Sequence, residues 1–346
     1  MNQDLPFDLQ SLRAAYAAGL DISEVVEEVY RRIQTLGDPG IFITVRDRGD
    51  VLKEAETLDR TQLESMPLWG LPFAVKDNID IAGMPTTAAC PDFAYEAKED
   101  AFVVQRLRAA GALLIGKTNL DQFATGLVGV RTPYPSPRNA IDPEVVPGGS
   151  SSGSAVAVAQ GLLSFSLGTD TAGSGRVPAA LNSIVGLKPS LGALSNRGVV
   201  PACRTLDCVS IFALTADDAF EIFKSVAVQD SRDAYSRAYP AFRRSGIVSH
   251  LRVGVPSAET IRFFGDEHQK QSFDRSINTL RENGAVVTEI DFDPFYAVAD
   301  LLYNGPWVAE RHTVIEALLA DKPDAVHPVT RQVTEVALGF SATDTF

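Results

Sequence analysis

The segment that most constrains the fold of this chain is a run of small residues, PGGSSSGSAVAVAQG, at positions 147–161. Glycine and serine let neighbouring backbones approach closely, and the Ala and Val residues that follow predict a tightly packed helix. A flexible Gly/Ser linker is the alternative. Because a linker rarely continues directly into a helix of buried character, we favour a buried loop and helix.

A second segment rich in small residues follows at positions 165–180, with the sequence FSLGTDTAGSGRVPAA. It predicts a short strand, a glycine-rich turn and a helix with Pro178 in its first turn. Ser174 falls where the strand gives way to the helix, and its small neighbours leave backbone N–H groups free around a bound oxygen. This arrangement is typical of a nucleophile beside an oxyanion hole, and a plain turn with an N-cap serine is an equal alternative. These small neighbours are Thr171, Ala172 and Gly173.

A lysine ends an apolar stretch in a third segment, LPFAVKDNIDIAG, at positions 71–83. The residues before Lys76 predict a buried strand, and lysine is rarely buried unless it is paired or functional. Burial lowers the pKa of a lysine, so that the neutral amine can act as a base. Taken alone, Lys76 is better explained by an ion pair with Asp77 or Asp80.

Three other motif-based interpretations have less support. Residues 149–153 match the GxSxG nucleophile elbow, but that elbow follows an apolar strand, and here a proline and a polar loop come first. No Lys-Ser or Lys-Thr pair closes the glycine run, which excludes a phosphate-binding loop. A Ser-His-Asp triad stays open because triads form in space, although no motif indicates one. The histidines are His250, His268, His312 and His327.

Lys76, the GGSSSGSA run and the GTDTAGSGR run, in this order, resemble the amidase-signature family over about residues 65–215. The resemblance implies that an amide is hydrolysed by a Ser-Ser-Lys triad. In that triad Lys76 is the base, Ser150 is the bridging serine on a cis peptide bond, and Ser174 is the nucleophile. The proton of Ser174 passes to Ser150, and that of Ser150 passes to the neutral lysine, without histidine.

The same resemblance assigns two supporting features. The oxyanion hole resembles one formed by the backbone N–H groups of Thr171, Ala172, Gly173 and Ser174. Asp170 and Arg176 also match the family pattern. We interpret them as a structural ion pair that fixes the glycine-rich turn, not as catalysts.

Two further segments, LDQFATGLVGVRTPY at 120–134 and LLYNGPWVAER at 301–311, resemble allophanate hydrolases more than general amidases or tRNA-dependent amidotransferases. This resemblance implies that Tyr303 and Arg311 bind the substrate, and a guanidinium suits a small ureido-carboxylate. Eight residues apart on one expected helix, the two side chains would lie near one face. The alternative is an amphipathic helix with Tyr303 in the core and Arg311 in solvent.

The reaction implied is hydrolysis of the terminal amide of allophanate to ammonia and N-carboxycarbamate through an acyl-enzyme. One alternative is an amidase for another small amide, such as a carbamoyl or aryl amide. The other is an inactive fragment or an interaction subunit.

Helix and strand patterns alternate along the chain and predict an α/β fold. The patterns are helical at 21–36, 98–110 and 267–283 and strand-like at 41–45, 112–116 and 285–290. The resemblance implies one amidase-signature domain over 1–346, with N-terminal helices in 1–60 and a catalytic core in 61–346 whose mixed central sheet is covered by helices. Because the family continues beyond the position of Phe346, we expect this chain to lack the family's C-terminal part, to be weakly active and to associate.

The composition excludes several functional classes. A formal net charge of −13 argues against nucleic acid or an anionic membrane as the main partner. The three cysteines form no CxxC pair, which argues against a disulfide framework or a zinc site and favours the cytoplasm. No apolar stretch approaches the length of about 18 residues that a membrane helix needs. We expect a small amide as the partner and no cofactor, and a homodimer stays open.

Overall fold

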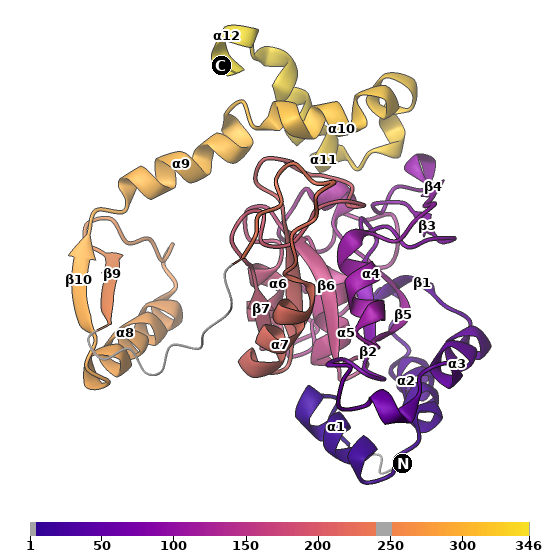
Figure 1. Ribbon diagram of the computed structural model, residues 1–346. Helices are drawn as coiled ribbons and strands as arrows, with labels where there is room; N and C mark the ends of the chain where they lie inside the picture. The colour runs from indigo at the N-terminus through magenta and orange to yellow at the C-terminus, as the bar shows by residue number, and fades with distance from the viewer. Residues whose placement is uncertain (1–4, 240–250, 346) are drawn as a thin grey trace. The chain divides into compact units, whose positions relative to one another are not determined.

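The computed structural model describes residues 5–239 and 251–345 of the protein (Figure 1). Contacts within the chain divide it into two compact units, Met1–Pro240 together with Trp307–Phe346, and Ala241–Pro306. The first unit contains all three residues of the expected triad. The single-domain organisation expected from the sequence stays a prediction.

The first unit is built on a six-stranded mixed sheet with the strand order β1-β5-β2-β6-β8-β7. β2 pairs in parallel with β5 and β6, and the other three pairings are antiparallel. Every residue of β2, β5, β6 and β8 is buried. The mixed central sheet expected for the fold is therefore confirmed. Its strands are β1 (Phe42–Val45), β2 (Pro72–Lys76), β5 (Leu113–Thr118), β6 (Phe165–Asp170), β7 (Val185–Leu187) and β8 (Cys208–Ala213).

Helices of the first unit pack on this sheet. α5 contacts the four central strands, α7 contacts β7 and β8, and α3 contacts β5. A separate short hairpin is formed by β3 (Pro85–Thr86) and β4 (Tyr95–Glu96). The helices are α1 (Leu9–Ala17), α2 (Ile22–Leu36), α3 (Arg48–Glu56), α4 (Phe102–Ala109), α5 (Ser152–Ala159), α6 (Arg176–Leu181), α7 (Ala216–Val226), α10 (Val308–Asp321), α11 (Pro328–Glu335) and α12 (Ala342–Thr345).

The run of small residues forms a buried loop followed by α5, as the sequence predicts, and the linker interpretation is wrong. Residues 147–158 are all buried. A Cβ atom on Gly153 would lie 2.1 Å from the carbonyl oxygen of Ile41 and 2.7 Å from the backbone nitrogen of Asn119. Both are backbone atoms, which cannot move aside as a flexible side chain can, so glycine is required where α5 meets the sheet.

The starts of α2 and α4 can be compared with the helices that the sequence predicts. α2 begins after Asp21, and the capping box between Asp21 and Glu24 is present. α4 starts at Phe102, later than expected, because the backbone at Ala101 is extended and its N–H donates to the carbonyl of Asp80.

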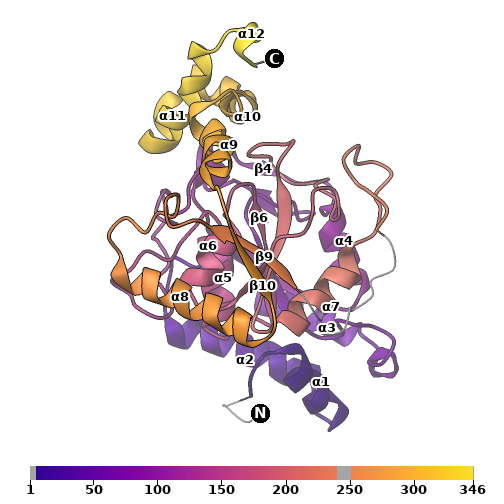
Figure 2. The same ribbon diagram turned by 90° about the vertical axis from the view of Figure 1, so that its left-hand side faces the viewer.

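Over its described residues, 251–306, the second unit contains one parallel strand pair and two helices. β9 (Arg252–Pro256) pairs with β10 (Val286–Ile290), and α8 (Glu267–Glu282) packs on β10 (Figure 2). α9 (Asp293–Asn304) follows β10. The helix expected over 267–283 and the strand expected over 285–290 are confirmed.

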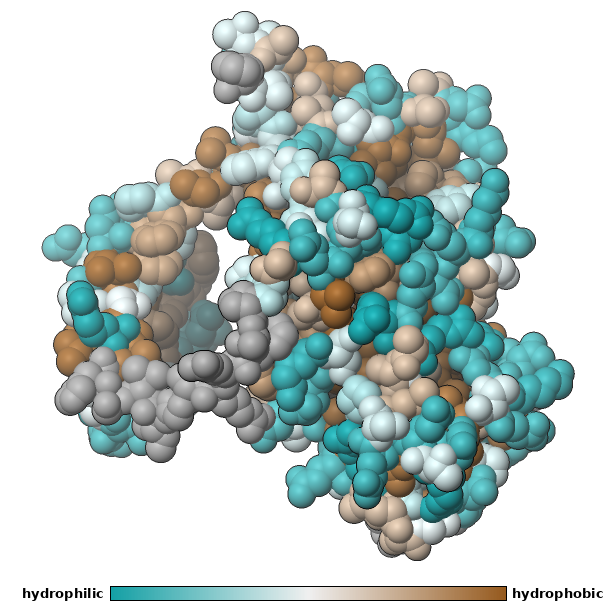
Figure 3. Space-filling view, in the orientation of Figure 1, coloured by the Kyte–Doolittle hydropathy of each residue, from teal (hydrophilic) through white to brown (hydrophobic). Residues whose placement is uncertain are grey.

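Hydrophilic side chains cover much of the face of the first unit that Figure 3 shows, with hydrophobic ones between them. Within residues 5–239 and 251–345, no helix is long and apolar enough to cross a membrane. The same residues contain no group of three or more His, Cys, Asp and Glu side chains placed to hold a metal ion.

Candidate active site

Lys76 is the last residue of β2, and its side chain is fully buried. Its Nζ forms hydrogen bonds with Ser150 Oγ at 2.7 Å and with Thr169 Oγ1 at 2.8 Å. Thr169 lies near the end of β6, and the carboxyl ends of the parallel strands β2 and β6 meet at one edge of the sheet. The strand pairing therefore brings the lysine to its hydroxyl partners.

Burial lowers the pKa of Lys76 to about 7. Loss of hydration disfavours the ammonium form, and this effect outweighs the surrounding carboxylates, which act in the opposite direction. Near neutral pH a large share of Lys76 is therefore the neutral amine, which can accept a proton. The carboxylates are those of Asp121, Asp207 and Asp170.

Lys76 forms no ion pair with Asp77 or Asp80, so that explanation of the buried lysine is wrong. Asp77 pairs with Lys117 of β5, whose Nζ lies 2.9 Å from Asp77 Oδ1. Asp80 accepts hydrogen bonds from two hydroxyl groups. Asp77 lies in the turn that follows β2, and its carboxylate contacts Lys117 of the neighbouring strand instead of Lys76.

Ser150 lies in the loop that leads into α5, and the peptide bond between Gly149 and Ser150 is cis, as the family resemblance implied. The carbonyl of Ser150 accepts a hydrogen bond from the N–H of Asp121 at 3.0 Å. The buried Asp121 carboxylate in turn accepts three backbone N–H groups, so one residue joins two loops at the site. These N–H groups belong to Val128, Gly129 and Arg131.

Ser174 lies in the glycine-rich turn after β6 and is 4% exposed. Its Oγ donates to the carbonyl of Gly126 at 3.4 Å, and its own carbonyl accepts the N–H of Ser151 at 3.3 Å. The turn is thus bonded to the residue that follows Ser150. In the described part of the chain, no hydrogen bond joins the hydroxyls of Ser174 and Ser150. Catalytic hydrogen bonds often tighten only in the complex with substrate.

The ion pair expected between Asp170 and Arg176 is confirmed. Arg176 Nε lies 2.9 Å from Asp170 Oδ2, and Arg176 Nη2 lies 3.0 Å from Asp170 Oδ1. The carboxylate also accepts the N–H groups of Gly173, Gly175 and Arg176. Asp170 therefore fixes the conformation of the turn that carries Ser174.

One of the four expected oxyanion donors is already used. The N–H of Gly173 donates to Asp170 Oδ1 at 2.7 Å, which corrects the expectation that it is free. The N–H groups of Thr171, Ala172 and Ser174 donate to no other residue that the structure describes. Three donors therefore remain for an oxyanion.

Arg311 lies on α10, and only 3% of it is exposed. Its Nη1 donates to Thr125 Oγ1 at 3.1 Å. Thr125 is followed directly by Gly126, whose carbonyl accepts the Ser174 hydroxyl. Arg311 and Ser174 thus contact adjacent residues of the same loop. The interpretation with Arg311 in solvent is wrong.

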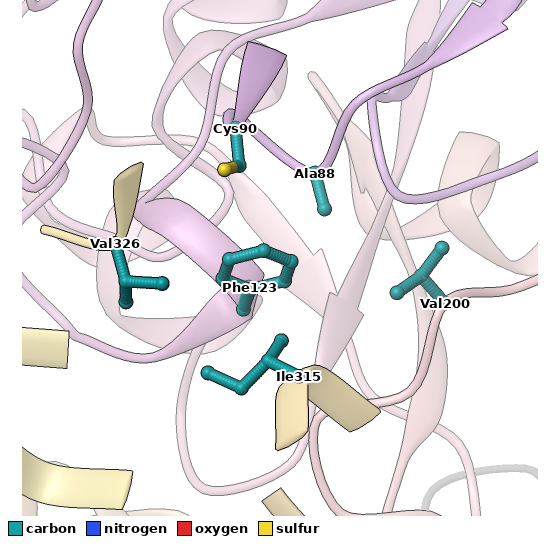
Figure 4. Close-up of a cluster of buried hydrophobic side chains, with 6 residues drawn as sticks. All are labelled: Ala88, Cys90, Phe123, Val200, Ile315 and Val326. Carbon is teal, nitrogen blue, oxygen red and sulfur yellow. The ribbon is translucent and has the colours of Figure 1, made fainter. Parts of the chain in front are cut away.

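Apolar packing holds α10 against this loop. Ile315, one turn beyond Arg311, belongs to a buried cluster with Phe123 at its centre (Figure 4). Phe123 lies two residues before Thr125. The other members are Ala88, Cys90, Val200 and Val326.

Tyr303 does not share a helix with Arg311. It lies on α9, which ends at Asn304, whereas α10 begins at Val308. The Gly305–Pro306 dipeptide separates the helices, because proline lacks an N–H and disfavours helical backbone in the residue before it. Tyr303 belongs to the second unit, and its role in substrate binding stays a prediction.

Sequence reasoning missed three polar residues around the expected triad. Thr169 is the second partner of Lys76, and Asp121 joins the two loops described above. Asp207 accepts hydrogen bonds from Thr171 Oγ1 and two backbone N–H groups, and burial raises its pKa. Thr169 falls in the GTD triplet just before the turn, which was the available signal. No comparable signal identified Asp121 or Asp207.

A buried lysine at the end of a central strand, bonded to a serine that precedes a buried helix, is the arrangement of an amidase-signature protein. The family model described as Amidase matches residues 24–342, and the chain belongs to this family. The solved structure of selenomethionine-substituted Kluyveromyces lactis allophanate hydrolase is similar, with a TM-score of 0.91 and 40% identity, covering 98% of this chain and 56% of that one.

Curated relatives fall into two groups. The urea amidolyase of Saccharomyces cerevisiae is 47% identical over 309 residues, which are 88% of this chain and 17% of that protein. A Glutamyl-tRNA(Gln) amidotransferase chain from Symbiobacterium thermophilum is 41% identical over 304 residues, which are 83% of this chain and 62% of that protein. The chain thus spans about a sixth of the length of the urea amidolyases that it matches.

Proposed function

We propose that this chain hydrolyses the terminal amide of allophanate, with Ser174 as nucleophile, Ser150 as bridging serine and Lys76 as base. The observation that carries the proposal is the 2.7 Å contact between Lys76 Nζ and Ser150 Oγ at a fully buried site. A lysine whose pKa is lowered to about 7 can act as a base at neutral pH.

The proposed reaction has two halves. In the first, Lys76 accepts the proton of Ser150 and Ser150 accepts that of Ser174 as Ser174 Oγ attacks the amide carbon. The C–N bond then breaks, the proton returns through the relay to the leaving nitrogen, and ammonia departs from the acyl-enzyme. In the second half, a water molecule activated by the same relay attacks the ester. N-carboxycarbamate leaves, and the Ser174 hydroxyl is restored.

The negative charge on the carbonyl oxygen needs donors that are fixed in advance. We assign this role to the N–H groups of Thr171, Ala172 and Ser174, which have no other partner among the described residues. Asp170 holds the turn in place and so orients these groups. Loss of one oxyanion donor commonly costs about 10²- to 10³-fold in rate.

Allophanate, a planar ureido-carboxylate, is the proposed substrate because of Arg311 and the relatives. The buried Arg311 guanidinium contacts Thr125, the residue next to the Gly126 carbonyl that Ser174 contacts, and can pair with the substrate carboxylate. The similarity to a solved allophanate hydrolase and to urea amidolyases supports the same substrate. Tyr303 is proposed as a further substrate-side residue on the resemblance alone.

The test is ammonia release from allophanate, acetamide and benzamide by the wild-type chain and by Ser174→Ala. The matched control is Ser164→Ala, because the buried Ser164 hydroxyl bonds to no described residue. Turnover of allophanate alone, lost in Ser174→Ala and kept in Ser164→Ala, supports the proposal. Broad turnover indicates an amidase for another small amide. A folded wild-type chain that releases no ammonia from any of them is not this enzyme.

A further inference from the structure

Two fully buried lysines lie on adjacent parallel strands, Lys76 at the end of β2 and Lys117 near the end of β5. In the register of these strands Val75 is opposite Lys117, and Lys76 is opposite Thr118. The two lysines are therefore offset by one residue in the register, and their side chains point to opposite faces of the sheet. The proposed reaction uses Lys76 and gives Lys117 no role.

The polar partners of Lys117 fit an ammonium group. Its Nζ lies 2.8 Å from the carbonyl of Pro85, 2.7 Å from Thr86 Oγ1 and 2.9 Å from Asp77 Oδ1. The Thr86 hydroxyl uses its own proton to bond Asp80, so its oxygen accepts from Lys117. Two hydrogen bonds and one ion pair suit the charged form of a lysine, which has donors only.

The partners of Lys76 differ in kind. It has two hydroxyl partners, Ser150 and Thr169, and no carboxylate within ion-pair distance among the described residues. Asn78 Nδ2 also donates to Thr169 Oγ1, at 3.4 Å. A neutral amine, with two donors and one lone pair, fits these partners. Burial lowers the pKa of Lys117 as well, but Asp77 acts in the opposite direction, whereas Lys76 has no paired carboxylate to do so in the part of the chain that the structure describes.

Asp77 connects the two lysines, because it follows Lys76 directly in the chain and pairs with Lys117. An uncompensated carboxylate there would favour the ammonium form of Lys76, since charges in a buried site are poorly screened. Asp121, Asp207 and Asp170 already act on Lys76 in that direction. The other titratable groups that Asp77 or Lys117 influences are Asp80, Tyr95 and Tyr134.

We propose that Lys117 is a positioning residue that neutralises the Asp77 carboxylate, so that the adjacent Lys76 stays the uncharged amine that a base must be. The importance of this for catalysis rests on the proposed function, whereas the charge state of Lys76 can be measured by itself. Lys117 touches none of the reacting groups and acts through Asp77.

The experiment follows the titration of Lys76 by NMR of protein labelled with ¹³Cε-lysine, with the signal assigned by its loss in Lys76→Met. The wild-type midpoint is expected near 7. Lys117→Met leaves Asp77 unpaired and should raise the midpoint by about one pH unit. Asp77→Asn leaves Lys117 unpaired and should lower it by about one unit. The double variant removes both charges and should return the midpoint to the wild-type value.

Opposite shifts that cancel in the double variant are not expected of a merely structural pair. Shifts in the same direction, or a double variant that stays displaced, would overturn the proposal. Because Asp77→Asn is nearly isosteric, its downward shift tests the proposal even if Lys117→Met does not fold, and an unchanged midpoint there would also overturn it. Arg48→Gln removes an exposed ion pair with Glu27 and should leave the midpoint unchanged.

Turnover of allophanate is measured on the same samples. If the wild-type chain hydrolyses no amide but the midpoints move as expected, the proposed function fails and the role of Lys117 stands. If the chain is active and the midpoints do not move, the role of Lys117 fails and the proposed function stands.

Discussion

Lys76 Nζ and Ser150 Oγ lie 2.7 Å apart, and neither side chain is exposed to solvent. The lysine comes from the end of a central strand and the serine from the loop before α5, 74 residues further along the chain. Thr169 Oγ1, at 2.8 Å, is the second partner of the same amine. A lysine held between two hydroxyls and away from water is suited to exchange a proton with one of them.

This contact predicts how the rate depends on pH. If neutral Lys76 is the base, kcat/KM should rise about tenfold per pH unit below the lysine pKa and level off above it, near pH 7. The rate rises with pH because Lys76 is mostly the neutral amine only above its lowered pKa. The measurement is a pH profile from 6 to 9 with circular dichroism at each point. A steady fall across this range by folded protein would contradict the assignment.

The contact between Arg311 and the loop at Thr125 predicts a change in specificity. Arg311→Ala should lower kcat/KM for allophanate by about 10- to 150-fold, because a charge-assisted hydrogen bond contributes about 1.5–3 kcal/mol. The loss for acetamide should be smaller, since that substrate has no carboxylate. Steady-state kinetics on both substrates decide the question, and equal losses would show that Arg311 has a structural role only.

The turn that carries Ser174 should show an asymmetric response to mutation. Asp170 is buried and accepts three backbone N–H groups, whereas 54% of the Arg176 side chain is exposed. Asp170→Ala leaves buried donors unsatisfied and should lower the free energy of unfolding by about 3 kcal/mol or more. Arg176→Ala should lower it by about 1 kcal/mol or less.

Urea denaturation of both variants measures the difference. We expect Asp170→Ala to be clearly the less stable of the two. Equal losses would mean that the ion pair, not the backbone hydrogen bonds, holds the turn.

Much of the fold could be predicted from the sequence because its signals are local. The capping box at Asp21, the small residues of α5 and the apolar strand before Lys76 each act within a few positions. The three residues proposed as the triad could be named from the sequence, because each lies in its own short motif.

What the sequence could not show depends on contacts between distant segments. The partner of Asp77 is Lys117, forty residues further along on a neighbouring strand, and no local pattern distinguishes this pairing from one with Lys76. Asp121 was missed for the same reason, since its role is to join loops that only the fold brings together. By contrast, the prediction of a single helix for Tyr303 and Arg311 was wrong although a local signal, the Gly305–Pro306 dipeptide, was present.

The most direct test of the central claim compares Lys76→Ala, Ser174→Ala and the double variant by kcat for ammonia release from allophanate. Residues that act as one unit lose about 10³- to 10⁶-fold when any one is removed, and further removal costs little more. We expect such a loss in each single variant and a double variant little worse than the poorer single one. A folded Lys76→Ala variant that kept a tenth of the wild-type kcat would show that Lys76 is not the base.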